Sequence, residues 1–315
     1  MRPLGSLAST AAPTPEALKS HLIYEICQAA GFRVGGWKQR ALTAALRRPI
    51  DSVALLFSDI DATIGRDGID VGFAKLLVRF VKDPLINGAE NLPDKGPLII
   101  ASNHPGAYDV LLIGSTLGRR DLRIVTSTVP LYHVMTNFRQ HTIEVGTTPE
   151  GGMRSIRESV RHVRNGGALL IFPSGLVDPD QDVLPGAREA LATWRPGVEV
   201  LVNLAPRAAV VQAVVSGVLS PRWINNPLLR LQKVEWQRRK LAEMLQVVQQ
   251  TVWPQTEKLS PRLTFGAPTS GEALYQEAGS KAVLPLLIGR AQVVLSQHMG
   301  AGAAKVGVGV TRWWS

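Results

Sequence analysis

Residues 97–109 read PLIIASNHPGAYD, and this stretch decides the expected fold. Its apolar run, Leu98 to Ala101, has the length and composition of a buried strand. Pro105 disfavours helical geometry at His104 and is itself suited to the first position of a helix. We therefore expect a strand that delivers His104 to the entrance of a helix over residues 108–117.

His104 and Asp109 form the candidate catalytic pair. With His104 outside the regular turns, its ring can fold back and meet the carboxylate of Asp109. A carboxylate that accepts a hydrogen bond from one ring nitrogen fixes the tautomer and leaves the other nitrogen as a base. In the simpler alternative His104 only caps the helix and Asp109 interacts with the helix dipole. The preceding strand, Asn103 and Pro105 favour the general base.

The segments that follow alternate between strand and helix patterns. Strand-like segments are expected at residues 122–125, 141–145, 168–172 and 209–215, and helical ones at 149–164, 187–194 and 227–252. This alternation predicts an α/β fold with a mostly parallel central sheet flanked by helices.

The chain is divided here into three parts. Residues 1–69 are expected to hold a loose start and N-terminal amphipathic helices, with an interruption at Gly35-Gly36. The basic second half of these helices suits either a lipid surface or ordinary packing on the domain. Residues 70–268 are expected to form the α/β domain, and residues 269–315 a C-terminal helical segment and tail.

A second candidate element is Phe172-Pro173-Ser174-Gly175, which follows the strand at 168–172. Ligand sites in open α/β sheets gather beyond the carboxyl ends of the strands. His104 and Gly175 would therefore lie at one edge of the sheet if their strands are parallel neighbours. A glycine there allows backbone N–H groups to approach a substrate oxygen, although the same sequence can be a simple turn.

Together these motifs resemble those of the glycerolipid acyltransferase superfamily, which includes the lysophospholipid and 1-acylglycerol-3-phosphate acyltransferases. The resemblance covers roughly residues 87–219 and includes the lead-in at 87–100. It implies that His104 deprotonates an acceptor hydroxyl while Asp109 orients its ring. The hydroxyl would attack the thioester of an acyl-coenzyme A or acyl-carrier protein, with no metal or redox cofactor.

The resemblance also implies the substrate-binding residues. They are expected to be Asn103, Phe172, Pro173, Ser174, Gly175 and Arg188, with an N–H near Gly175 holding the developing oxyanion. Ser174 stands where the family usually has glutamate, Leu176 and Val177 replace Thr-Arg, residues 143–146 carry no arginine, and Gln212 replaces a proline. These departures weigh against a glycerol-phosphate acceptor, with Arg188 as a loose substitute for the missing cations.

The composition indicates anionic partners. The formal charge is +10 and the isoelectric point is about 10.1, which favours phospholipid surfaces, acidic carrier proteins or phosphorylated ligands. Aromatic residues make up only 6% and zinc-finger spacing is missing, which weighs against nucleic acid. No apolar run reaches the ~18 residues of a spanning helix. We therefore expect a peripheral membrane protein on the cytoplasmic face that meets a lipid acceptor there.

A stripe of arginines marks the helix expected at 149–164. Arg154, Arg157, Arg161 and Arg164 repeat at helical spacing, and Met153, Ile156, Val160 and Val163 repeat one position earlier. The stripe is either a solvated face above a core face or a contact surface for anionic lipid or carrier protein.

Two other functions are possible from the sequence. Asp59 and Asp61 follow an apolar run at 53–57, a pattern similar to the nucleophile motif of haloacid dehalogenase-type phosphatases. Such an enzyme would need a magnesium-binding acidic pair, for which Asp178, Asp180 and Asp182 are candidates. The other alternative is a non-catalytic basic membrane-binding protein. Cys27, the single cysteine, excludes an internal disulfide and is expected to be a buried thiol.

Overall fold

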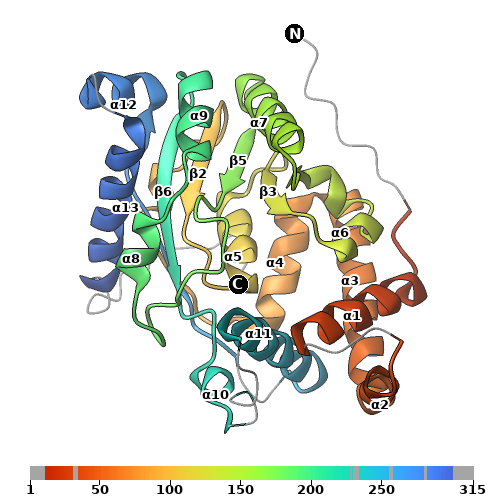
Figure 1. Ribbon diagram of the computed structural model, residues 1–315. Coiled ribbons are helices and arrows are strands. Elements are labelled where there is room, and N and C mark those ends of the chain that lie inside the picture. Colours follow the sequence, from red (N-terminus) through yellow and green to blue (C-terminus); the bar gives the residue numbers. More distant parts are fainter. Residues whose placement is uncertain are drawn as a thin grey trace. The chain divides into compact units, whose positions relative to one another are not determined.

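The computed structural model describes residues 11–30, 35–227, 229, 234–254, 258–279 and 282–300. The chain divides into two compact units that are interleaved in sequence (Figure 1). One is helical and comprises residues 1–80, 129–141 and 220–258; the other contains the sheet and comprises residues 81–128, 142–219 and 259–315. The expected starting segment at 1–10, part of the helix expected at 227–252, and the tail from 301 lie outside the described residues.

The second unit is built on an eight-stranded sheet with the order β1-β7-β6-β2-β5-β3-β4, and β8 pairs with β6. The strands are β1 (Leu85–Asn87), β2 (Leu98–Ser102), β3 (Arg123–Ser127), β4 (Thr142–Val145), β5 (Ala168–Ile171), β6 (Ala209–Ser216), β7 (Arg262–Phe265) and β8 (Thr269–Ser270). Among the described strands, only the pairs that β6 makes with β7 and β8 are antiparallel. The predicted α/β fold with a mostly parallel sheet is therefore confirmed.

Helices cover the sheet. They are α5 (Ala107–Leu117), α7 (Pro149–Arg164), α8 (Ala187–Ala192), α9 (Gly197–Leu204), α12 (Gly271–Ala278) and α13 (Val283–Gly300), with the short 3₁₀ turn η1 (Ala89–Asn91). In β2, Ile99 and Ala101 pack into a core with residues of α7, α9, α12 and α13. Leu98 and Ile100 alternate to the opposite face and are also fully buried. Burial on both faces explains why the strand is continuously apolar.

The register of the sheet brings three strand ends together. β2 pairs in parallel with both β5 and β6, so that Ala101 lies beside Ile171 on one side and Gln212 on the other. The segments that follow β2 and β5 therefore leave the sheet at the same edge. This places His104 and the 172–175 segment as the sequence predicted.

The first unit consists of helices in the part of it that the structure describes. These are α1 (Pro15–Ala30), α2 (Trp37–Ala45), α3 (Arg47–Asp67), α4 (Ile69–Phe80), α6 (Pro130–Val134), α10 (Pro221–Ile224) and α11 (Glu235–Val252), with the 3₁₀ turn η2 (Phe138–His141). Buried positions of α3, among them Ile50, Val53, Ile60 and Ile64, follow the spacing of a single helix face. Cys27 in α1 is fully buried, and burial raises the pKa of its thiol.

The phosphatase motif is not confirmed by this unit. Asp59 and Asp61 lie in the middle of α3, whereas a phosphatase nucleophile of that type needs a strand to end just before it. Asp61 is buried and accepts backbone N–H groups from Asn137, at 3.2 Å, and Phe138, at 2.8 Å. Its carboxylate therefore holds the turn at η2 in place.

The predicted three-part division differs from the two units. The limits at 69/70 and 268/269 fall inside continuous structure, because α4 follows α3 after Gly68, and α12 and α13 join the core of the sheet unit. As boundaries of independently folding domains they stay predictions.

Among the described helices, no single one is long and apolar enough to cross a membrane. The bent pair α12 and α13 passes the same test by length and composition only.

Candidate active site

His104 lies two residues beyond the end of β2, and Asp109 lies in the first turn of α5. The Nδ1 atom of His104 is 2.8 Å from Oδ2 of Asp109. The Asp109 side chain is fully buried, whereas 29% of the His104 side chain is exposed. The buried carboxylate therefore holds one ring nitrogen, while the ring itself remains accessible from solvent.

Asp109 also fixes the start of the helix. The same Oδ2 atom accepts the backbone N–H of Gly106 at 3.1 Å, and α5 begins at Ala107. Pro105 thus lies before the helix and not at its first position, which corrects the sequence prediction. One oxygen of Asp109 thus both contacts the His104 ring and caps the start of the helix, a capping role that the simpler alternative had given to His104. The other oxygen, Oδ1, is buried without a hydrogen-bond partner.

The segment after β5 encloses His104. The ring of Phe172 stacks on the imidazole with centroids 4.4 Å apart and planes inclined by 28°. The backbone N–H of His104 donates to Oδ2 of Asp178 at 2.8 Å, and the N–H of Asp178 donates to the carbonyl of His104 at 2.7 Å. His104 is therefore fixed through its ring and through its main chain. Burial raises the pKa of the Asp178 carboxyl.

The hydroxyl of Ser174 and the N–H of Gly175 are both engaged within the segment that follows β5. The Ser174 hydroxyl is buried, donates to the carbonyl of Leu176 at 3.1 Å and accepts its N–H at 3.3 Å. Gly175 has a φ of +66°, and its N–H donates to the carbonyl of Phe172 at 3.0 Å. The oxyanion donor predicted near Gly175 is therefore not the N–H of Gly175 itself, because the turn already uses that group.

Three further predicted binding residues have structural partners. The Asn103 amide donates to the carbonyl of Val215 at 2.9 Å and accepts its N–H at 2.8 Å, which extends the β2–β6 ladder by one residue. Pro173 is buried, and its carbonyl accepts the N–H of Arg195 at 3.0 Å. Arg188 donates to the hydroxyl of Ser296 on α13 at 2.8 Å. The structure thus brings Phe172 onto His104 but engages Asn103 and Arg188 elsewhere.

The structure adds two residues, Arg195 and Asp178, that the sequence did not predict to belong to this site. The guanidinium of Arg195 lies beside Gly175, where an added Cβ would be 3.5 Å from its Cζ and Nη1 atoms. It supplies a positive charge next to the segment that lacks the Thr-Arg pair. A basic residue one position before Pro196 carries no motif that could have indicated this contact. Asp178 was considered only as a metal ligand.

The acidic residues after this segment do not form a metal centre. Asp180 is buried and accepts the N–H groups of Gly217, at 2.9 Å, Val218, at 2.9 Å, and Leu219, at 3.1 Å. Asp182 pairs with Arg262 and accepts the hydroxyl of Ser216. Within the described ranges, no group of three or more His, Cys, Asp or Glu side chains has the arrangement of a metal site.

A buried carboxylate that contacts one nitrogen of a histidine is an arrangement that general-base catalysis uses. Residues 84–197 match the family model described as Acyltransferase. The matched range contains His104, Asp109 and the Phe172–Gly175 turn. The match confirms the resemblance to acyltransferases that these motifs indicated.

Comparison with curated proteins gives no significant match. Among solved structures, the chain is similar to the crystal structure of the 1-acyl-sn-glycerophosphate (LPA) acyltransferase PlsC from Thermotoga maritima. The two share 14% sequence identity with a TM-score of 0.46, over 92% of this chain and 98% of that chain.

Proposed function

We propose that this acyltransferase moves a fatty acyl group from acyl-coenzyme A or acyl-carrier protein to a hydroxyl group of a lipid acceptor. The observation that carries the proposal is the 2.8 Å contact between His104 and Asp109 at the carboxyl edge of the sheet. The thioester is a co-substrate, and direct transfer from it to a hydroxyl requires no metal or redox cofactor in itself.

The pair supports a general-base step. With the Nδ1 proton donated to Asp109, the lone pair lies on Nε2 and can take the proton of the acceptor hydroxyl. The hydroxyl oxygen then forms a bond to the thioester carbon, the tetrahedral intermediate collapses, and the carbon–sulfur bond breaks. The thiolate leaves with the proton from the imidazolium. The buried Asp109 carboxylate, with Oδ1 unpaired, stabilises the positive charge of that imidazolium.

The segment after β5, residues 172–178, positions His104 and is expected to contact the substrate. Phe172 restrains the plane of the ring, and Asp178 restrains the main chain of His104. Leu176 and Val177 are 63% and 43% exposed, so that apolar side chains stand in the segment after β5 where the family usually has Thr-Arg. These side chains favour contact with an acyl chain, while Arg195 provides a cation for an anionic group of the substrate.

We further propose that the protein acts at an anionic membrane surface, on the cytoplasmic face. Arg154, Arg157, Arg161 and Arg164 are all exposed on α7, and the chain carries a net charge of +10. Met153, which belongs to the apolar stripe of the same helix, is 54% exposed. Cations together with an exposed apolar side chain are suited to the headgroup region of a bilayer.

A screen of donors against acceptors tests the function. The purified chain is incubated with acyl-coenzyme A or acyl-carrier protein and with lysophosphatidate, lysophosphatidylglycerol or monoacylglycerol, and products are identified by mass spectrometry. We expect an ester product with at least one pair and its loss in His104→Ala, with His21→Ala on α1 as the matched control. A product formed equally by His104→Ala would contradict the proposed base and favour another catalytic centre.

Failure of every donor with the wild-type protein, together with unchanged vesicle binding by His104→Ala, would favour the alternative of a non-catalytic basic membrane-binding protein.

A further inference from the structure

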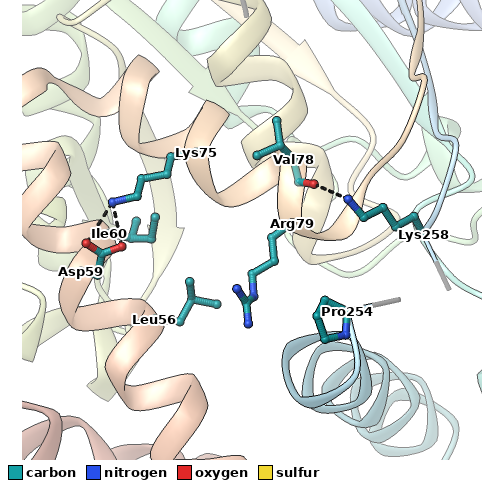
Figure 2. Close-up of a pocket in the computed structure, with 8 residues that line it drawn as sticks. All are labelled: Leu56, Asp59, Ile60, Lys75, Val78, Arg79, Pro254 and Lys258. Carbon is teal, nitrogen blue, oxygen red and sulfur yellow. Dashed lines mark hydrogen bonds and ion pairs between the residues drawn. The ribbon is translucent and has the colours of Figure 1, made fainter. Parts of the chain in front are cut away.

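The helical unit contains a cavity of about 360 Å³ (Figure 2). Its walls come from α3, α4 and the residues that follow α11, and none of its lining residues belongs to the His104 site. The volume lies within the range of small-molecule sites in proteins.

Lys75 and Asp59 form an ion pair within this cavity. The Nζ atom of Lys75 lies 2.9 Å from Oδ1 and 2.7 Å from Oδ2 of Asp59. Lys75 also donates to the hydroxyl of Thr63 at 3.1 Å. Since both oxygens of Asp59 are taken by one ammonium group, this carboxylate is directed to Lys75 and not to the other cations of the cavity.

The other two cations meet only neutral acceptors. Arg79 donates from Nη2 to the carbonyl of Thr251 at 2.9 Å, and Lys258 donates from Nζ to the carbonyl of Val78 at 3.0 Å. Among the residues that the structure describes, neither forms an ion pair with a carboxylate. The Nε atom of Arg79 is buried and has no hydrogen-bond partner. Leaving such a donor unpaired is costly, and an anion in the cavity would supply the counter-charge that the guanidinium lacks.

The remaining walls are aliphatic. Leu56, Ile60, Val78 and Pro254 line the same space. Figure 2 shows the guanidinium of Arg79 extending between Leu56 and Pro254. A ligand held by Arg79 would therefore contact apolar side chains at the same time. A guanidinium also matches the geometry of phosphate oxygens, to which it can donate two parallel hydrogen bonds.

We propose that this cavity is a second ligand site, which binds a phosphate-bearing amphiphile such as a phospholipid. The phosphate lies on Arg79 and Lys258, and the first carbons of the apolar part lie against Leu56 and Pro254. Inorganic phosphate would use the two cations but not these walls, and an uncharged lipid would leave the cations without a counter-charge. The site does not depend on the function proposed for His104.

Calorimetric titration of the full chain tests this site. The probes are dihexanoyl phosphatidate as dispersed monomers, inorganic phosphate, and dihexanoylglycerol. We expect saturable binding of dihexanoyl phosphatidate that weakens about tenfold or more in Arg79→Gln/Lys258→Gln, because two charge-assisted contacts are lost. The control is Lys82→Gln/Arg222→Gln, which removes the same charge from two exposed positions and should change affinity less than about twofold.

Two further variants separate the outcomes. Leu56→Trp keeps both cations but fills the cavity, and it should abolish binding of dihexanoyl phosphatidate. His104→Ala should leave this binding unchanged, whatever it does to acyl transfer. The proposal is overturned if the wild-type protein does not bind dihexanoyl phosphatidate, or if Arg79→Gln/Lys258→Gln binds it as tightly as wild type. Equal affinity for inorganic phosphate or for dihexanoylglycerol would also overturn it.

Discussion

At the scale of single residues, one carboxylate oxygen connects the start of a helix to the candidate base. Oδ2 of Asp109 accepts both the Gly106 N–H and the Nδ1–H of His104. Because the oxygen that starts α5 also fixes the imidazole, the position of the base is tied to the fold itself. Asp178, in the segment after β5, also helps to fix this position, because its carboxylate accepts the backbone N–H of His104.

Asp178 is expected to act as a positioning residue. Asp178→Ala removes the acceptor for the His104 N–H, so that the ring is less well placed, and kcat should fall about tenfold while KM for the acceptor changes little. Asp178→Asn keeps an acceptor oxygen and should restore most of the rate. Steady-state kinetics of both variants check this. Equal losses in the two variants would show that the carboxylate does more than hold the main chain.

Arg195 is expected to contribute to substrate binding through its charge beside Gly175. Arg195→Gln should raise KM for lysophosphatidate about tenfold with kcat within about twofold, because one charge-assisted contact is lost. KM for monoacylglycerol should stay the same. Equal effects on the two acceptors would show that Arg195 serves the donor or the fold.

The sequence predicted this site only in part. The contact between His104 and Asp109 followed from the proline between them, although Pro105 lies before the helix and not in it. The contact between Asp178 and the His104 N–H could not be predicted, because it joins residues 74 positions apart. The N–H of Gly175 itself is used within a tight turn, which depends on backbone geometry that no residue pattern specifies, and an oxyanion donor near Gly175 stays a prediction.

At the scale of elements, regular hydrophobic spacing predicted the bounds of those helices and strands that bury one or both of their faces. The helix expected at 149–164 matches α7, and the strand expected at 98–101 is β2 with one residue more. The run at 53–57 was linked to a phosphatase motif, although the buried positions of α3 already show helical spacing over a longer window. β7, which joins the sheet antiparallel to β6, was not predicted, since pairing between distant strands is not encoded locally.

The arginine stripe of α7 is expected to contact anionic lipid. Arg154→Glu/Arg161→Glu reverses two exposed charges and should weaken binding to vesicles rich in phosphatidylglycerol about tenfold or more, at about 1 kcal/mol for each cation near the surface. Sedimentation with vesicles measures the binding. Lys95→Glu/Arg222→Glu changes the net charge equally and serves as the control. Equal losses in the two double variants would indicate net charge and not this stripe.

At the scale of the whole molecule, a buried histidine links stability to pH. His298 of α13 is 1% exposed and contacts Ser216 at 2.8 Å and Thr264 at 2.9 Å. Burial is the main cause that lowers its pKa from 6.5 to about 4. A depressed histidine pKa means that the unfolded chain binds the proton more tightly than the folded one. Stability is therefore complete above about pH 6.5 and is lost as the pH falls toward 4.

Denaturant unfolding at several pH values checks this dependence. The free energy of unfolding should drop by up to about 3 kcal/mol as the pH falls from about 6.5 to about 4. Burial also lowers the pKa of His162, which therefore acts in the same direction. The drop should be smaller in His298→Gln. A wild-type stability that stays constant down to pH 4 would contradict the buried, neutral state of His298.

The most direct measurement of the central claim is the kcat/KM of Asp109→Asn for acyl transfer, on the best donor and acceptor pair, next to the exposed control Asp94→Asn. Loss of the carboxylate removes both the fixed tautomer and the stabilisation of the imidazolium. We predict a fall of about 10²–10⁴-fold in a protein that remains folded, with Asp94→Asn unchanged. Wild-type turnover by a folded Asp109→Asn protein would show that His104 is not a base oriented by this carboxylate.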